Sequence, residues 1–134
     1  MNTQTTSEYL LIFRGTDWHK GLSPEEIQTV TTNWRAWFER LTREGKAKAG
    51  QPLVNEGKLV SGRNGRVVVD GPFAESKEAI GGYFLLQVES LDRAVAIAQE
   101  CPGLGYGAVV EVRPVAAQCQ MMERAQADLA RAEA

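Results

Sequence analysis

Apolar residues recur along this chain at spacings that predict strands in some stretches and helices in others. Residues 9–13 form a short apolar run that ends in Arg14-Gly15, which is typical of a strand covered on both faces. Residues 27–41 repeat an apolar side chain every three or four positions, as one side of a helix does. This stripe consists of Ile27, Val30, Trp34, Trp37, Phe38 and Leu41. Its two tryptophans are interpreted as core residues, and a ligand platform is the alternative.

Signals at both ends support this helix. Ser23-Pro24-Glu25-Glu26 combines a capping serine, a proline suited to the first helical position and a glutamate that completes a capping box. Gly45 marks the end, and Arg43 lies where a positive charge favours the helix C-terminus. We therefore expect a helix of about 30 Å.

After the first helix, the sequence pattern up to residue 115 predicts a hairpin, two further strands and a second helix. Strand patterns occupy residues 53–60, 66–69 and 83–89. The turn formers Ser61-Gly62-Arg63-Asn64-Gly65 join the first two patterns into a hairpin. Ser90 begins a second helix, which ends at Pro102-Gly103. Residues 108–115 are expected to form the last strand, and residues 46–51 are interpreted as a basic linker. This order predicts an α+β sheet with helices on one face.

The polarity of the two ends divides the chain into three parts. Residues 1–7 are polar and expected to be disordered, and residues 8–116 are expected to form one domain. Residues 117–134 predict an amphipathic helix. An isolated helix of this length is marginal in water, so it needs a surface to pack on.

Composition excludes several classes of function. The chain has 134 residues, 43% hydrophobic and 24% charged, with a net charge of −2 and scattered basic residues, so no nucleic-acid footprint is visible. One histidine and two cysteines without CxxC spacing make a zinc site implausible, and we expect no metal or cofactor. No apolar run approaches the ~20 residues that span a bilayer, and the polar start lacks a signal-peptide core. We therefore expect a cytoplasmic protein that does not contact membranes.

The densest turn and charge chemistry lies in residues 70–83. Asp70-Gly71-Pro72 predicts a chain reversal, because Asp bonds nearby backbone, Gly tolerates positive φ and Pro fixes its own φ. Gly81-Gly82 removes two Cβ atoms where the next strand begins, so that another backbone or a ligand can approach closely. Between them, Lys77 and Glu78 are either solvated loop charges or polar groups held over a cleft.

Three motifs in this stretch, Asp70-Gly71-Pro72-Phe73, Glu75-Ser76-Lys77-Glu78 and Gly81-Gly82-Tyr83, resemble the signature of the DGPF group of YCII-related proteins. The similarity continues to Glu111-Val112-Arg113-Pro114-Val115 and covers residues 8–115. The resemblance implies a ferredoxin-like α+β fold that pairs as a dimeric α/β-barrel assembly with a cleft. It implies no known reaction. The C-terminal helix would be an addition to that fold.

The resemblance also indicates which mechanism of the wider family this chain does not share. The wider YCII group includes a dehydrochlorinase-like enzyme and proteins with a proposed histidine–aspartate pair. This chain has Thr32-Asn33-Trp34-Arg35 where their histidine falls, and Cys101-Pro102 where their acidic residue precedes a proline. That mechanism is therefore not transferred. DGPF members are also often linked with sigma factors of the extracytoplasmic-function type, which implies a regulatory or accessory role.

We expect the candidate site at the sheet face that the helices leave open. The catalytic candidates are Asp70, Tyr83, Arg113 and His19, and the ligand-binding candidates are Lys77, Glu78, Gln87 and Glu111. Arg113 suits a carboxylate or enolate oxygen, and Asp70, Glu78 or Glu111 could act as general base if burial raised its pKa. His19 follows a strand, and imidazole titrates near neutral pH. Alternatively, Glu111 and Arg113 form a structural ion pair across a dimer.

Three functions stay open at this point. The first is a homodimer that binds a small molecule without catalysis, motivated by the polar sheet face and the lack of a nucleophile–base pair. The second is a cofactor-free lyase or isomerase that acts on a small carboxylate or aromatic compound. The third is a protein-interaction accessory that docks through residues 118–134.

Overall fold

The computed structural model describes residues 5–54, 56–71, 79–116 and 120–133. The strands and helices, in chain order, are β1 (Ser7–Arg14), α1 (Pro24–Arg43), β2 (Ala47–Pro52), β3 (Lys58–Ser61), β4 (Val67–Asp70), β5 (Ile80–Val88), α2 (Leu91–Ala98), β6 (Val109–Pro114) and α3 (Gln120–Glu133). Two short 3-10 helices, η1 (Arg63–Gly65) and η2 (Leu104–Tyr106), lie in the connections.

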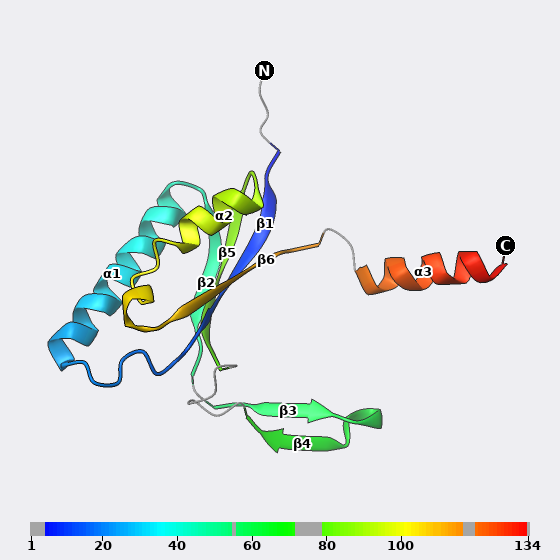
Figure 1. The fold of residues 1–134 in the computed structure, drawn as a ribbon, viewed down its shortest axis with the longest axis horizontal. Helices are drawn as coiled ribbons and strands as arrows, with labels where there is room; N and C mark the ends of the chain where they lie inside the picture. Colours follow the sequence, from blue (N-terminus) through cyan, green and yellow to red (C-terminus); the bar gives the residue numbers. More distant parts are fainter. Residues whose placement is uncertain (1–4, 55, 72–78, 117–119, 134) are drawn as a thin grey trace.

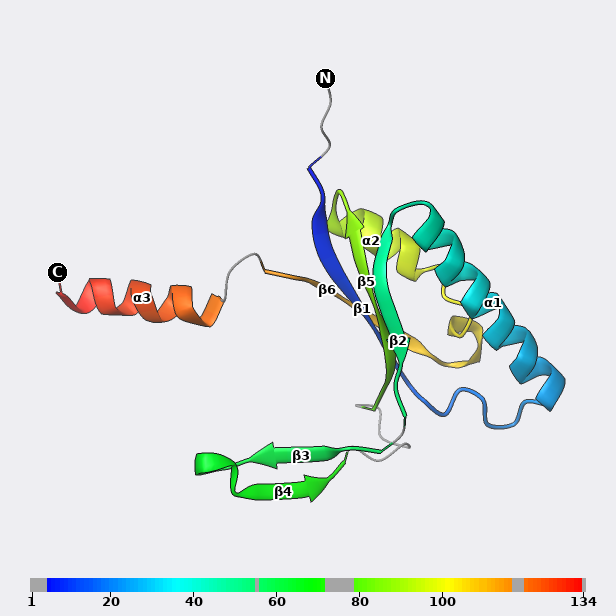
Figure 2. The ribbon, with the colours of Figure 1, turned by 180° about the vertical axis from the view of Figure 1, so that it is seen from behind.

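The main sheet is antiparallel and has the strand order β2-β5-β1-β6. Figure 1 and the reverse view in Figure 2 show α1 and α2 on the same side of this sheet. Each helix connects two strands of the sheet, β1 to β2 and β5 to β6, which is the ferredoxin-like arrangement. The predicted α+β fold, with helices on one face and an additional C-terminal helix, is confirmed.

The core lies between the sheet and the two helices. Its buried side chains come from both layers: Tyr9, Leu11, Phe13, Trp37, Leu41, Phe84, Leu86, Val88, Ala94 and Ile97. Leu11, Leu41 and Leu86 are 0% exposed, so the centre of the core joins β1, α1 and β5. Full burial of a side chain of this size contributes about 1.5–3 kcal/mol.

The predicted start of α1 is confirmed in detail. The Ser23 hydroxyl accepts a hydrogen bond from the Glu26 backbone N–H (3.1 Å), and the Glu26 carboxylate accepts one from the Ser23 backbone N–H (3.0 Å). At the other end, Gly45 has φ +75° and its N–H donates to the Thr42 carbonyl. Both ends of the helix are therefore closed by groups that the sequence identified.

The second face of β1 is not covered by a helix. Leu10 and Ile12 alternate with the core residues of β1 and are half-buried, so the expectation of a strand covered on both faces is wrong for the single chain. Leu85 of β5 opposes Leu10, and Tyr83 opposes Ile12, on this same open face.

Residues 46–51, interpreted as a linker, instead provide most of β2. This edge strand pairs with β5, from Ala47 opposite Leu86 to Pro52 opposite Gly82, with an irregularity between Ala47 and Ala49. Alanine, lysine and glycine are poor strand formers, so hydrogen bonding to β5 overrides local preference here. Glycine is needed at position 50, because its backbone lies directly against Phe38 and Phe84.

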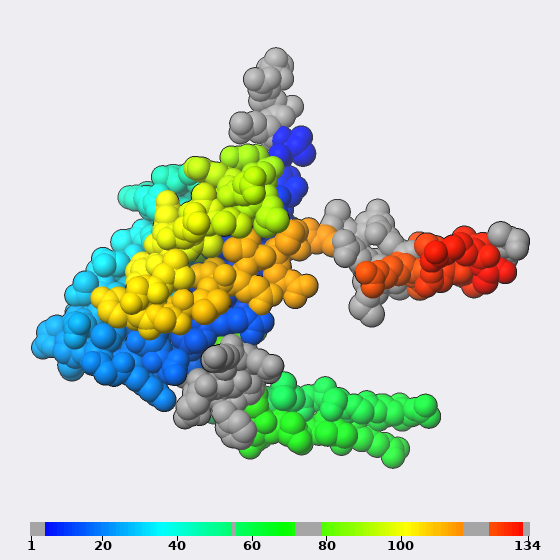
Figure 3. All heavy atoms as spheres, viewed as in Figure 1, coloured from blue at the N-terminus to red at the C-terminus, as the bar shows by residue number. Residues whose placement is uncertain are grey.

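The hairpin is shorter than predicted and does not join the main sheet. β3 and β4 form a separate two-stranded sheet with Leu59 opposite Val69 and Val60 opposite Val68, all exposed. Figure 3 shows the hairpin and α3 as two arms that project from the body, on the side away from α1 and α2. Within the described part of the chain, none of the helices is both long and apolar enough to cross a membrane.

Candidate functional site

The open face brings several predicted site residues together. Tyr83 and Glu111 flank Ile12 from the two neighbouring strands, because β1 pairs with both β5 and β6. Arg113 lies two residues from Glu111 on the same face, and its Nη1 atom is 3.6 Å from Glu111 Oε2. The pairing of Glu111 with Arg113 therefore occurs within one chain.

Glu111 has a closer partner that the sequence did not identify. Nε of Arg14 donates a hydrogen bond of 2.7 Å to Glu111 Oε1, and the two side chains are each 29% exposed. The Glu111 carboxylate thus lies between two guanidinium groups, Arg14 and Arg113. Arg14 contacts Oε1 of this carboxylate and Arg113 lies near Oε2.

The other predicted residues are more dispersed. Gln87 lies on β5 toward the opposite end of the open face, where its Nε2 donates to Thr6 Oγ1 at 2.9 Å. Asp70 lies in the separate hairpin, where its carboxylate pairs with Lys58 Nζ, so the structure does not place it beside Tyr83 and Arg113. His19 is exposed in the connection between β1 and α1, with its ring 5.9 Å from that of Trp18. Two further candidates, Lys77 and Glu78, fall outside the described residues.

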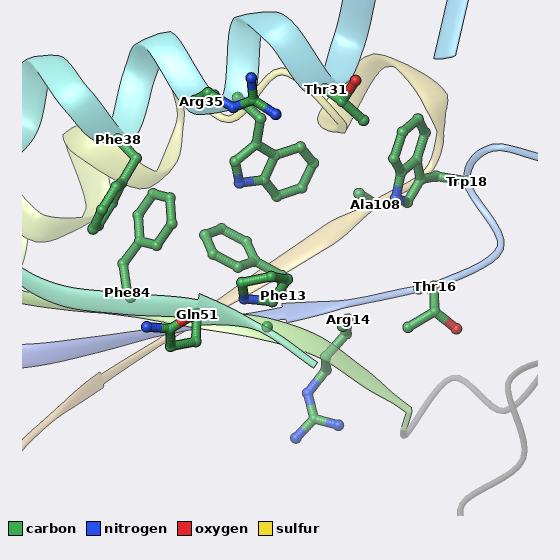
Figure 4. Close-up of a pocket in the computed structure, with 16 residues that line it drawn as sticks. Phe13, Arg14, Thr16, Trp18, Thr31, Arg35, Phe38, Gln51, Phe84 and Ala108 are labelled. Atoms are coloured by element: carbon green, nitrogen blue, oxygen red, sulfur yellow. The ribbon is translucent and has the colours of Figure 1, made fainter. Parts of the chain in front are cut away.

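A cavity of about 400 Å³ lies on the opposite, helix-covered side of the sheet. It is bounded by α1, the connection after β1 and the adjoining ends of β1, β2 and β5 (Figure 4). Five aromatic rings line it: Phe13, Trp18, Trp34, Phe38 and Phe84. We call this cavity the aromatic pocket.

The rings of the aromatic pocket hold one another in place. Phe13 packs edge-on against Trp34 and Phe84, with ring centres 5.0 and 4.8 Å apart. Trp18 stacks on Trp34 at 6.1 Å with 30° between the planes, so the connection after β1 closes one side of the pocket. Such edge-to-face and offset contacts contribute about 0.5–1.5 kcal/mol each beyond the area that they bury. The walls of the pocket are therefore supported by direct contacts between the rings.

Glycines on β2 and β5 form the side of the aromatic pocket that faces the sheet. A Cβ at Gly50 would lie 2.8 Å from ring carbons of both Phe38 and Phe84. At Gly82 it would lie 2.8 Å from the Gln51 carbonyl oxygen. The close approach predicted for Gly81-Gly82 is thus made at Gly82 by the backbone of β2.

The rim of the aromatic pocket is polar. Arg35 and Thr31 lie one turn apart on α1, and Thr16 also lines the pocket. Arg14 and Gln51 line it too, but the Arg14 guanidinium is directed away from the pocket (Figure 4) and Gln51 pairs with Tyr83 of the open face. The Thr31 hydroxyl donates to the Gln28 carbonyl at 3.0 Å. Among the described residues, no aspartate, glutamate, histidine, lysine or cysteine lines the pocket.

The perturbed titratable groups lie elsewhere. Burial raises the pKa of Cys101 to about 11, so this thiol, beyond the end of α2, is protonated and inert at neutral pH. A hydrogen bond to Glu100 raises the pKa of Arg40, and one from Lys46 lowers the pKa of Glu44, both near the C-terminal end of α1. In the described ranges, no group of acidic, histidine and cysteine side chains could hold a metal ion.

Sequence reasoning missed the aromatic pocket because its signal was ambiguous. Trp34 and Trp37 belong to one helical stripe, yet Trp37 is 5% exposed in the core and Trp34 is half-buried at the cavity. The interpretation of both as core residues is confirmed for Trp37, and Trp34, which lines the cavity, also packs against the core. The ligand-platform alternative stays a prediction. Helical spacing identifies the side of the helix that faces inward, but not where the inside is hollow.

Comparison with known proteins gives two matches. The family model of the YCII-related domain matches residues 8–117. A protein of Rhizobium meliloti (strain 1021), uncharacterized protein R00369, is 43% identical over 101 residues, which covers 70% of this chain and 79% of that protein.

Proposed function

The chain belongs to the YCII-related domain family, and we propose that within this fold it binds a small, largely apolar molecule in the aromatic pocket. The observation that carries this proposal is a cavity of about 400 Å³ whose walls are five aromatic rings. Ligand sites are typically concave, mostly apolar and largely pre-formed, with a few polar groups. A volume near the lower end of the usual range of about 300–1,000 Å³ suits a compound of one or two rings.

Binding is favoured over catalysis by the chemistry of the lining. Proton transfer needs a carboxylate, imidazole, amine or similar group within hydrogen-bond reach of the substrate. The described lining holds none of these groups, although it holds two arginines. The lyase or isomerase alternative would have to recruit Tyr83 and Arg113, which lie on the other face of the sheet. We therefore expect a bound compound to be recovered unchanged.

The test uses a variant that obstructs the mouth of the pocket. Thr31 is exposed on α1 and lines the pocket, so Thr31→Phe should narrow the entrance without disturbing the core. Thr32→Phe, at an exposed position beside it that does not line the pocket, is the matched control. Isothermal titration with naphthalene-2-methanol should give binding to the wild type and the control, and weaker binding to Thr31→Phe. Equal binding by all three proteins, or by none, would reject the proposal.

We further propose that the open sheet face pairs two copies of the chain. Helices cover only one face, while Leu10, Ile12 and Leu85 present apolar surface on the other. The hairpin and α3 project on this same side, where they could reach a partner. A single two-stranded hairpin is at best marginally stable in water, so a partner surface would stabilise it.

Light scattering can test this pairing. Leu85→Lys places a charge in the centre of the open face and should shift the mass toward that of a monomer. Val95→Lys, on α2 and 38% exposed, should leave the mass unchanged. A monomeric mass for the wild type at micromolar concentration would refute the dimer.

A further inference from the structure

We infer that the ligand of the aromatic pocket is a planar aromatic molecule with one negatively charged group, held at the pocket mouth by Arg35. This inference rests on the proposed function, because it specifies the chemistry of the compound that the same pocket binds.

The charged side chains that line the pocket, among the described residues, are all positive. They are Arg14 and Arg35, and no acidic side chain among the described lining residues accompanies them. Arg14 is bonded to Glu111 on the open face, and Figure 4 shows its guanidinium directed away from the pocket. Arg35 therefore provides the positive charge that a bound ligand would meet.

Arg35 differs from the arginines around it in having no partner among the described residues. Arg40 pairs with Glu100 at 2.6 Å, and Arg93 lies 3.8 Å from Glu89. In the part of the chain that the structure describes, no ion pair, hydrogen bond or ring contact involves Arg35, although Glu39 lies one turn further along α1. Its guanidinium is free to bind an anion without first breaking an existing pair.

The rings and the guanidinium together define the ligand. Offset stacking and edge-to-face contacts with Phe13, Trp34 and Phe84 favour a planar ring over a flexible chain of equal volume. The planar fork of Arg35 matches the two oxygens of a carboxylate, which accept parallel hydrogen bonds. A cation would be repelled, and a highly polar ligand would lose hydration against apolar walls. An arenecarboxylate satisfies both parts of the pocket.

Two compounds that differ in charge but share one ring system can measure the effect of the negative charge on affinity. Naphthalene-2-carboxylate and naphthalene-2-methanol share one ring system, and only the first is anionic at neutral pH. We expect the carboxylate to bind wild-type protein about three- to tenfold more tightly at low ionic strength, as suits a partly exposed charge-assisted pair. High salt should reduce this preference.

Arg35→Gln should abolish the preference for the carboxylate and leave the affinity for the alcohol unchanged. Arg43→Gln, which removes an exposed arginine from the last turn of the same helix, controls for net charge and should keep the preference. Circular dichroism melting should show both variants to be folded and close to the wild type in stability, because neither side chain is buried, with Arg43→Gln losing only the small favourable effect of a positive charge at the helix C-terminus.

The outcomes separate this inference from the proposed function. If the alcohol binds as tightly as the carboxylate, or if Arg35→Gln retains the preference, the role of Arg35 is overturned while the pocket remains a binding site. If neither compound binds, the proposed function fails, and this inference fails with it.

Discussion

Replacing Gly82 with alanine tests the close approach of β2 to β5 beneath the aromatic pocket. Gly82 is buried and pairs with Pro52 of β2 and Phe13 of β1. An added Cβ would lie 2.8 Å from the Gln51 carbonyl oxygen and 3.2 Å from Pro52 Cα. Both are backbone atoms, so the overlap can be relieved only if β2 moves away from β5.

The expected loss of stability is the difference between two opposing effects. Forcing extra atoms into a packed site typically costs about 1–3 kcal/mol. Alanine recovers about 0.4–1 kcal/mol by restricting the unfolded chain more than glycine does. The free energy of unfolding of Gly82→Ala should therefore fall by about 1–2 kcal/mol. For a chain of 134 residues this corresponds to a decrease in Tm of roughly 3–10 °C.

Urea unfolding followed by tryptophan fluorescence measures this change, because Trp37 lies in the core and Trp34 packs against it. Gly105→Ala is the matched control, since an added Cβ there would meet nothing within 4 Å. Its free energy of unfolding should equal the wild-type value or exceed it by up to about 1 kcal/mol, because only the effect on the unfolded chain remains. If Gly82→Ala is as stable as Gly105→Ala, the close approach of the two strands is wrong.

Three further predictions concern other parts of the molecule. Glu100→Ala should lower the free energy of unfolding by about 1 kcal/mol in urea titrations, because Trp37 Nε1 donates to Glu100 Oε1 at 3.1 Å, and Glu100→Gln should lose less. In a Cys119→Ser background, Cys101 should react with iodoacetamide only after unfolding. Because its folded pKa of about 11 exceeds the unfolded value of 9.0, stability should also fall as pH rises between these values. Truncation after Ala116 removes α3 and should preserve the circular dichroism spectrum while weakening self-association on dilution; an unfolded product would place α3 in the core.

The sequence predicted what depends on local pattern. Strand alternation correctly placed Tyr83 and Glu111 on the open face, because side chains two residues apart in a strand share a face. The capping box at Ser23 located the start of α1 for a similar reason. Each of these features is decided by residues within one turn or one strand.

What the sequence could not predict depends on contacts between distant residues. β2 lacks strand-forming side chains, and only its hydrogen bonds to β5 reveal it as a strand. The aromatic pocket exists because Trp18 and Trp34, from different segments, enclose space above Gly50. The Arg14–Glu111 pair joins residues 97 positions apart. No local pattern identifies such neighbours.

The central position of β1 has a consequence for synthesis in the cell. Leu11 pairs with Phe84 of β5 and Val112 of β6, so both neighbours of the first strand are made long after it. While the ribosome is still translating the hairpin, β1 has two unpaired edges, and the apolar side of α1 has no finished sheet to cover. Exposed apolar surface and free strand edges make nascent chains prone to aggregation. The sheet can close only after residue 114 has left the exit tunnel, so β1 and the apolar side of α1 stay uncovered until translation of the domain is nearly complete.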